Sequence, residues 1–235
     1  MCGRYRLSRQ AQFLRDHYGI DDEVEWAPRY NIAPTQQVAV VRQHPNEPKR
    51  TFAAMRWGLV PHWATDPNIG AKMINARAET AAEKPAFSEP LRKRRCLIPA
   101  DGFYEWARRN GSKQPYCFMM RDNASFSFAG LWDGWRAPDG QWIRTCSILT
   151  TTPNALLADV HDRMPVILSP DNYDLWLDPG FADVPSLIDL LKPFDAKAMR
   201  RFEVSTKVNA VANDDENVCA PLSEATPGAQ IALGF

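Results

Sequence analysis

Closely spaced turn signals divide this chain into short segments, and this spacing constrains its fold more than any other feature. Asn110-Gly111 and Pro138-Asp139-Gly140 each lie between two runs that favour strands, and an Asn-Gly pair is preferred in the tight turn of a β-hairpin. The nineteen prolines interrupt long helices but are tolerated in loops and at strand edges. The chain is therefore predicted to contain a sheet rather than a helical bundle.

The residue pattern predicts a succession of strands and short helices. Strands are expected over 38–42, 51–57, 96–98, 103–108, 116–121, 126–131, 142–150 and 164–168. Helical segments are expected over 9–18 with Ser8 as the N-cap, 76–84, 88–94, 153–158, 170–177 and 185–191. Because short turns join neighbouring strands, the expected fold class is α+β, with a mostly antiparallel, barrel-like sheet and short flanking helices. A single domain is expected over residues 1–222, followed by a loose tail over 223–235.

Charge and cysteine content exclude several classes of protein. The formal net charge is zero, so no overall field attracts the chain to nucleic acid or to an anionic membrane. Five widely spaced cysteines without a CxxC pair indicate neither a disulfide framework nor a structural zinc site. No apolar run reaches the length of about twenty residues that a membrane helix needs, and the N-terminus does not resemble a signal peptide. A cytoplasmic protein with reduced thiols, no membrane span and no metal is expected.

The cysteine at position two carries the clearest chemical signal. Removal of Met1 would leave Cys2 with a free α-amine beside its thiol. The usual pKa values of these groups are about 8 and about 8.5, so a usable fraction of each is nucleophilic near neutral pH. The amine of such a pair can form an imine with an aldehyde, and the sulfur can then close a five-membered thiazolidine ring. The alternative is that a cysteine at this position has no chemical role.

Three other polar side chains are candidates for chemistry, and each has a structural alternative. Asn75 precedes a predicted helix, where it would either orient a reactant or cap the helix. Glu105 lies on a predicted strand among three aromatic residues. An apolar pocket would raise its pKa toward a proton-transfer role, whereas a solvent-facing position would leave it inert. His161 is either a proton-transfer group or a core histidine.

Cationic and aromatic residues allow a nucleic-acid interpretation. On their own, Arg4 and Arg77 are explained as surface charges or ion-pair partners. The basic run 91–95 and the eight tryptophans have simpler explanations, namely a solvated helix face and core packing. Without geometry, the tryptophans do not indicate a stacking platform.

Seven segments along the chain resemble one known family. They are 1–5 (MCGRY), 29–34 (RYNIAP), 57–61 (WGLVP), 74–80 (INARAET), 98–106 (IPADGFYEW), 161–168 (HDRMPVIL) and 205–209 (STKVN). In this order they resemble the SOS-response-associated peptidase (SRAP) family, from Cys2 to about Leu222. Seven ordered motifs are far more specific than any one of them.

The resemblance implies a protein that captures abasic sites in single-stranded DNA through a thiazolidine DNA–protein crosslink, shielding the lesion in the DNA damage (SOS) response. It implies the SRAP fold, no cofactor, and a monomer that associates with the nucleoid and with replication-fork proteins. By motif position, the catalytic group is Cys2, Asn75, Glu105 and His161. Asn75 would orient the amine or sugar, Glu105 would move protons during imine formation, and His161 would assist ring opening and closure. The implied DNA-binding residues are Arg4, Asn31, Pro34, Arg77, Thr150 and Arg163.

Two other functions remain compatible with Cys2. A cysteine peptidase with Cys2 as N-terminal nucleophile would use its own α-amine as the base, with an activity limited to cleaving Met1 or its own crosslinked peptide. A non-catalytic reader of modified DNA bases would not need the thiol.

The chain departs from the family pattern at one place. Some members carry an aromatic pair shortly before the INAR segment, where DNA bases stack. Here residues 66–70 read Asp-Pro-Asn-Ile-Gly, and the nearest tryptophan is Trp63. The sequence therefore leaves open which residue supports the bases beside the lesion.

Overall fold

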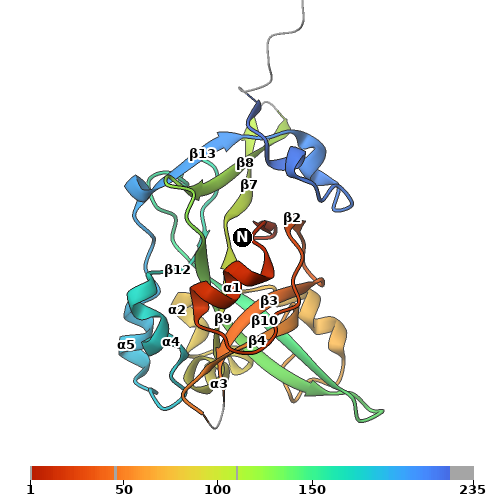
Figure 1. Ribbon diagram of the computed structural model, residues 1–235, viewed down its shortest axis with the longest axis vertical. Coiled ribbons are helices and arrows are strands. Elements are labelled where there is room, and N and C mark those ends of the chain that lie inside the picture. The colour runs from red at the N-terminus through yellow and green to blue at the C-terminus, as the bar shows by residue number, and fades with distance from the viewer. Residues whose placement is uncertain (1, 45–46, 110, 223–235) are drawn as a thin grey trace, which may run out of the picture.

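Two sheets share one main hydrophobic core in the computed structural model, which describes residues 2–44, 47–109 and 111–222 (Figure 1). One sheet closes into a barrel because β10 pairs with both β4 and β9. Around the barrel the order is β10 (Trp142–Thr151), β4 (Arg50–Trp57), β3 (Gln37–Gln43), β6 (Arg95–Ala100) and β9 (Phe126–Arg136). These pairs are antiparallel except for β4 with β10, which is parallel.

Three short strands extend the barrel sheet. β5 (Asn75–Arg77) pairs with β10 in parallel, and β11 (Met164–Pro165) pairs with it antiparallel. β12 (Ile167–Leu168) pairs with β9. The prediction of one strand over 164–168 was therefore wrong in detail. Between β11 and β12, Val166 bonds to both partner strands through its backbone, so the segment passes from one to the other.

The second sheet lies over one side of the barrel and is antiparallel (Figure 1). Its strand order is β13 (Met199–Glu203), β8 (Ser112–Met120), β7 (Gly102–Arg109), β1 (Tyr5–Leu7) and β2 (Arg29–Ile32). The predicted hairpin between β7 and β8 is confirmed by their register, in which Arg109 faces Ser112. Asn110 of its turn lies outside the described residues.

The helices are short and surround the sheets. They are α1 (Ala11–Tyr18), α2 (Ala78–Ala81), α3 (Pro85–Lys93), α4 (Tyr173–Leu177) and α5 (Val184–Asp189), with several 3₁₀ turns. The prediction of one helix over 76–84 was wrong, because residues 75–77 pair with β10 as β5 before α2 begins. Residues 153–158 form turns rather than a helix. Here the Asn154 side chain accepts hydrogen bonds from the next backbone N–H groups, which competes with helical bonding.

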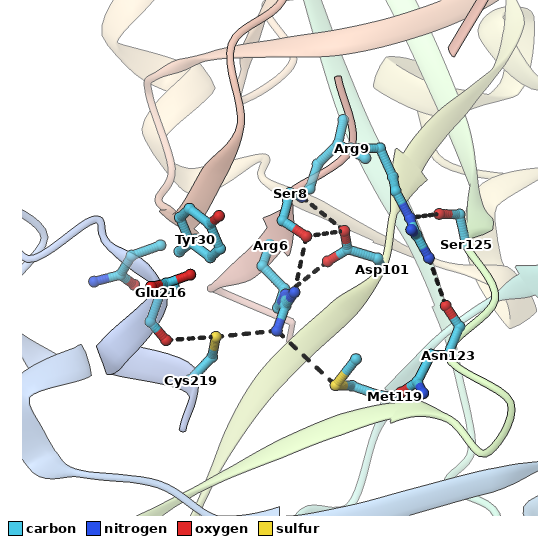
Figure 2. Close-up of polar contacts among 12 residues, drawn as sticks. Arg6, Ser8, Arg9, Tyr30, Asp101, Met119, Asn123, Ser125, Glu216 and Cys219 are labelled. Carbon is cyan, nitrogen blue, oxygen red and sulfur yellow. Dashed lines mark hydrogen bonds and ion pairs between the residues drawn. The ribbon is translucent and has the colours of Figure 1, made fainter. Parts of the chain in front are cut away.

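Ser8 does not cap α1, contrary to the sequence prediction, because its hydroxyl is engaged elsewhere. The Ser8 Oγ and backbone N–H both donate to Asp101, at 2.7 Å each. Arg6 Nε donates to the same carboxylate at 2.6 Å, and the Arg6 guanidinium continues to Ser8 and Cys219 (Figure 2). This network joins β1 to the turn before β7 and to the 3₁₀ turn Glu216–Cys219. It therefore holds the position of β1, the strand that follows Cys2.

Tyr5 anchors the same strand in the barrel core. Its ring packs edge-on against Trp57 and Phe128, with centroid distances of 5.4 and 5.6 Å. All three side chains are fully buried. Aromatic pairs with this geometry add to the stabilisation from apolar burial, so the position of β1 is determined from both ends.

Two of the sequence motifs pack directly against each other. Trp57 Nε1 donates a 2.8 Å hydrogen bond to the carbonyl oxygen of Ile74. Gly58 has φ of 128°, and a Cβ there would lie 2.6 Å from the carbonyl oxygen of Gly70. A side chain is therefore excluded, and the loop from Gly58 returns close enough to place Asn75 beside β10.

The fold class is confirmed as a single α+β unit with a barrel and an additional antiparallel sheet. The sequence placed most of the strands within a few residues but missed β1, β2 and β13. The predicted loose tail over 223–235 lies outside the described residues. None of the helices in the described part of the chain has the length and apolar character needed to span a membrane.

Candidate active site

Cys2 lies in the short segment that leads into β1 and belongs to the main hydrophobic core. The whole Cys2 residue is inaccessible to solvent. The hydrogen bond from the Tyr104 N–H to the Arg4 carbonyl oxygen, 2.9 Å long, holds this end of β1 beside β7. Burial raises the pKa of the Cys2 thiol far above its usual range, and the nearby Glu105 carboxylate raises it further. The sulfur is therefore protonated at neutral pH in this state.

Asn75 contacts Cys2 directly. Its Nδ2 donates a 2.8 Å hydrogen bond to the carbonyl oxygen of Cys2. The Oδ1 atom of Asn75 is buried and has no hydrogen-bond partner within residues 2–44, 47–109 and 111–222. Asn75 does not cap the following helix, since the N-cap position of α2 is Arg77. The helix-cap alternative is therefore wrong, and the amide faces the cysteine with an acceptor available.

Glu105 is a buried carboxyl group on β7. Only 3% of its surface is exposed, so the solvent-facing alternative is wrong. Burial raises the pKa of Glu105 to about 8, because a low-dielectric environment disfavours the carboxylate. Near neutral pH this side chain therefore exchanges between its acid and base forms, which is the property of a proton-transfer group.

His161 is partly exposed, with 28% of its side chain accessible, so it is not a core histidine. The backbone N–H of Arg163 donates to its Nδ1 at 3.0 Å. In the tautomer that accepts this bond, Nδ1 carries no proton and the neutral ring has its proton on Nε2. Burial lowers the pKa of His161 although Asp162 acts in the opposite direction. Asp162 is 2.9 Å from Nδ1 but 88% exposed, so solvent screens its charge and the neutral form prevails.

Glu105 and His161 line the same pocket of about 400 Å³, together with Arg4, Trp106, Arg108, Lys113 and Asn209. Three of these residues are cationic, so the pocket suits an anionic ligand although the net charge of the chain is zero. The four predicted catalytic residues thus form one cluster. Cys2 touches Asn75 and is electrostatically coupled to Glu105, and Glu105 and His161 face a common space.

A segment near the C-terminal end of the described chain, residues 208–213, closes one side of this pocket. Arg4 Nη1 donates to the Asn31 Oδ1 and to the Val208 carbonyl oxygen, each at 2.8 Å. Asn31 Nδ2 in turn donates to three carbonyl oxygens of the segment, those of Val208, Ala210 and Asn213. Trp106 Nε1 donates to the Asn209 Oδ1 at 2.7 Å. Asn31 therefore positions Arg4 and the segment that carries Asn209.

The other residues predicted to bind DNA occupy different environments. Arg77 is exposed, whereas Thr150 is buried and Pro34 is partly buried. Arg163 forms a bidentate pair with Glu79, at 2.7 and 2.8 Å, and also donates to the Thr150 carbonyl oxygen. Arg4 reaches the pocket. Contacts of these residues with DNA stay a prediction.

Sequence reasoning missed several residues of the pocket. Arg108 and Lys113 belong to the β7–β8 hairpin, and only their pairing across it brings them together. Asn209 is the last residue of the STKVN motif. The motif singled out this residue, but nothing in the sequence indicated that it lies in this pocket. Asp214 was also missed, although it accepts hydrogen bonds from the backbone N–H groups of Tyr30 and Asn31.

No metal centre is evident in the described ranges, where His, Cys, Asp and Glu side chains do not gather in threes. All five cysteines are free thiols.

The chain is similar to several known proteins. Abasic site processing protein YoqW of Bacillus subtilis is 44% identical over 218 residues, which span 91% of this chain and 96% of that protein. Abasic site processing protein HMCES of Gallus gallus is 33% identical over 271 residues, covering 97% and 80%. A crystal structure of a protein from Bacteroides thetaiotaomicron superposes with a TM-score of 0.86 at 28% identity, covering 94% of this chain and 99% of that one. The family described as SOS response associated peptidase (SRAP) matches residues 1–211, and this chain belongs to it.

Proposed function

We propose that this protein processes abasic sites in single-stranded DNA by forming a covalent thiazolidine crosslink through Cys2 after removal of Met1. The observation that carries the proposal is the cluster itself: a cysteine at position two contacts Asn75 and lies beside a carboxyl group with a pKa of about 8. The names of the relatives, abasic site processing proteins, support the substrate. An abasic site in its ring-opened form presents an aldehyde, which is the partner that an aminothiol requires.

The proposed reaction needs neither an oxidant nor a reductant. The Cys2 α-amine attacks C1′ of the open-chain deoxyribose and gives a carbinolamine, which loses its hydroxyl and the amine proton as water to give an imine. The Cys2 sulfur then bonds to the same carbon, and the thiol proton passes to the imine nitrogen. One aldehyde and one aminothiol thus become one thiazolidine and one water.

Each neighbouring side chain has a defined part in these steps. Asn75 holds the Cys2 carbonyl, and its buried Oδ1 is available to accept a hydrogen bond from the freed α-amine. Glu105, protonated in about half of the molecules near pH 8, donates a proton to the departing hydroxyl and takes one back. His161 offers its Nε2–H to the ring oxygen of the sugar during ring opening and serves the same atoms on reversal.

The cations of the pocket would hold the phosphates beside the lesion. Arg4, Arg108 and Lys113 line the space in front of Glu105, and charge-assisted bonds to phosphate are short and strong. Arg77 is a further candidate because its side chain is exposed on the edge strand that carries Asn75. This arrangement favours a single strand, since the reacting sugar has to enter a pocket.

The decisive experiment compares the wild-type protein with Cys2→Ala on abasic single-stranded DNA in a denaturing gel. We expect a shifted band that survives denaturation for the wild type and none for Cys2→Ala, while both bind the intact strand. A second variant carries one extra residue between Met1 and Cys2, which keeps the thiol but separates it from the α-amine. It should not crosslink.

Three outcomes would reject the proposal in different ways. Crosslinking by Cys2→Ala at wild-type yield would show that sulfur is not needed. Normal crosslinking by the extended variant would show that the α-amine is not needed. Turnover of peptides without any crosslink would indicate the N-terminal-nucleophile peptidase instead, and the mass of the intact wild-type protein reports whether Met1 has been removed.

A further inference from the structure

A second pocket lies on the barrel and shares no lining residue with the pocket beside Glu105. It measures about 470 Å³ and is formed by the loop after β4, α3, β9 and β10. We call it the hairpin pocket, because it lies along the β9–β10 hairpin that extends from the barrel in green in Figure 1. Its principal residues are Arg94, Trp132, Asp133, Gly134, Trp142 and Arg144.

The hairpin pocket presents an exposed aromatic surface. Trp142 is 63% exposed, the largest exposed fraction among the large hydrophobic side chains that the structure describes. The six-membered ring of Trp142 lies against Gly134, about 3.5 Å from where a Cβ would stand. Trp132 also lines the pocket and is partly buried. The guanidinium carbon of Arg42 lies over its ring, 5.0 Å from the ring centroid. A solvent-exposed indole ring on a strand offers a flat apolar face to a ligand.

Some guanidinium N–H groups near these rings have no hydrogen-bond acceptor in the described part of the chain. Burial lowers the pKa of Arg42, and the like charge of Arg144 lowers it further. The Nε of Arg42 and the Nη2 of Arg94 are both buried without a hydrogen-bond partner in the described part of the chain. Arg144 is exposed in the lining of the pocket, and the charge of Arg42 beside it adds to the positive field that an anion would meet there.

The carboxylates of the pocket are already engaged and do not neutralise Arg42 or Arg144. Asp133 accepts from the backbone N–H groups of His62 and Gly134, at 3.0 and 2.8 Å, and lies 3.2 Å from Arg94 Nε. Glu89 accepts from Arg94 Nη1 at 3.0 Å. These contacts hold Arg94 in the wall of the pocket and engage both carboxylates, which leaves the exposed Arg144 to meet an anion.

We propose that the hairpin pocket binds a segment of single-stranded nucleic acid, with a base stacked on Trp142 and a backbone phosphate on Arg144. A single strand combines an exposed π-face with a regularly repeated negative charge, which is what this surface matches. Base pairs in a duplex hide their faces, and an acidic peptide has the charge without the π-face.

This inference deepens the proposed function, since the strand whose abasic site reacts at Cys2 would continue to the hairpin pocket. Binding there requires no abasic site and no free α-amine. The two proposals can therefore fail separately, because intact DNA tests only the hairpin pocket.

The test measures the affinity of Trp142→Ala and Arg144→Ala for intact single strands by fluorescence anisotropy, at several salt concentrations. Both side chains are exposed, so folding should be unaffected, and thermal unfolding checks this. Trp142→Phe keeps an aromatic face, and Lys192→Ala removes one exposed cation elsewhere. Strands of about 5 and about 15 nucleotides separate the two pockets, because single-strand sites span about 4–16 nucleotides.

We expect Trp142→Ala to weaken binding of the long strand roughly tenfold, and Arg144→Ala to reduce the salt slope by about one unit. Trp142→Phe and Lys192→Ala should resemble the wild type. An abasic 5-mer should crosslink equally with all of them once it saturates the protein. Unchanged long-strand affinity and salt slope in both Ala variants would overturn the proposal, and so would an equal loss of duplex binding, which would indicate a simple cationic patch.

Discussion

The side-chain amide of Asn75 donates a 2.8 Å hydrogen bond to the carbonyl oxygen of Cys2. Asn75 lies on β5, which pairs with β10 of the barrel. The bond therefore ties the N-terminal end of the chain to the barrel. It determines where the α-amine and the sulfur stand relative to the barrel.

Asn75→Asp should slow crosslink formation by about tenfold or more. The carboxylate has the same shape but cannot donate to the Cys2 carbonyl, and the lost bond to a buried group costs about 1–3 kcal/mol. Single-turnover crosslinking on an abasic oligonucleotide measures the rate, with binding of the intact strand as the control. A wild-type rate would remove Asn75 from the proposed mechanism.

Glu105→Gln should make the stability of the protein less dependent on pH. The folded state raises the pKa of Glu105 to about 8, so between the usual carboxyl value and pH 8 it holds a proton that the unfolded state has released. Stability therefore falls as pH rises through this window, by at most about 1.4 kcal/mol per unit for one group. Urea unfolding between about pH 5 and pH 8 should show this slope in the wild type and its loss in Glu105→Gln. Glu89→Gln, at an exposed carboxylate whose pKa is lowered by Arg94, should keep it.

His161→Ala should slow both formation and reversal of the crosslink. Because the neutral ring carries its proton on Nε2 (Nδ1 accepts from Arg163), it acts as a donor in both directions. The expected loss is about 10²-fold, the low end for a positioned acid–base group. Rapid-mixing experiments give the forward rate, and a chase of the preformed crosslink with excess trap DNA gives the reverse rate. Wild-type rates in both directions would assign His161 a structural role.

Arg77→Ala should change DNA binding, whereas Arg163→Ala should change the stability of the fold. Arg77 is exposed, so its loss should weaken binding of intact and abasic single strands alike and lower the salt slope by about one unit. Arg163 bonds to Glu79 and Thr150, so its loss should destabilise the fold by about 1–3 kcal/mol. Salt titrations and thermal unfolding of both variants separate the roles. An unchanged salt slope for Arg77→Ala would make it a structural residue.

The barrel strands could be predicted from local sequence because each combines β-branched or aromatic residues with a turn signal at its end. β3 and β4 are examples, since their predicted ranges differ from the observed ones by only one residue at the ends. β1 and β2 could not be predicted in the same way. They are short and contain polar residues, and they are strands because Arg6 and Asp101 bond across the sheet and Asp214 holds the N–H groups of β2.

The four proposed catalytic residues could be selected from the sequence, but their chemistry could not. The raised pKa of Glu105 depends on how completely β7 is covered, and the tautomer of His161 depends on one backbone bond from Arg163. Asn75 illustrates the limit most clearly. Its position before a helix suggested a cap, whereas pairing with β10 turned its amide toward a residue 73 positions away.

The bond between Arg4 and the Val208 carbonyl oxygen joins residues 204 positions apart. During synthesis on the ribosome, the segment around Cys2 emerges long before the segment that forms the opposite wall of its pocket. The pocket is complete only when translation of the whole domain is nearly finished. The proposed aldehyde capture would therefore be a property of the finished domain, and a nascent or truncated chain would expose a cysteine without the groups proposed to direct its reaction.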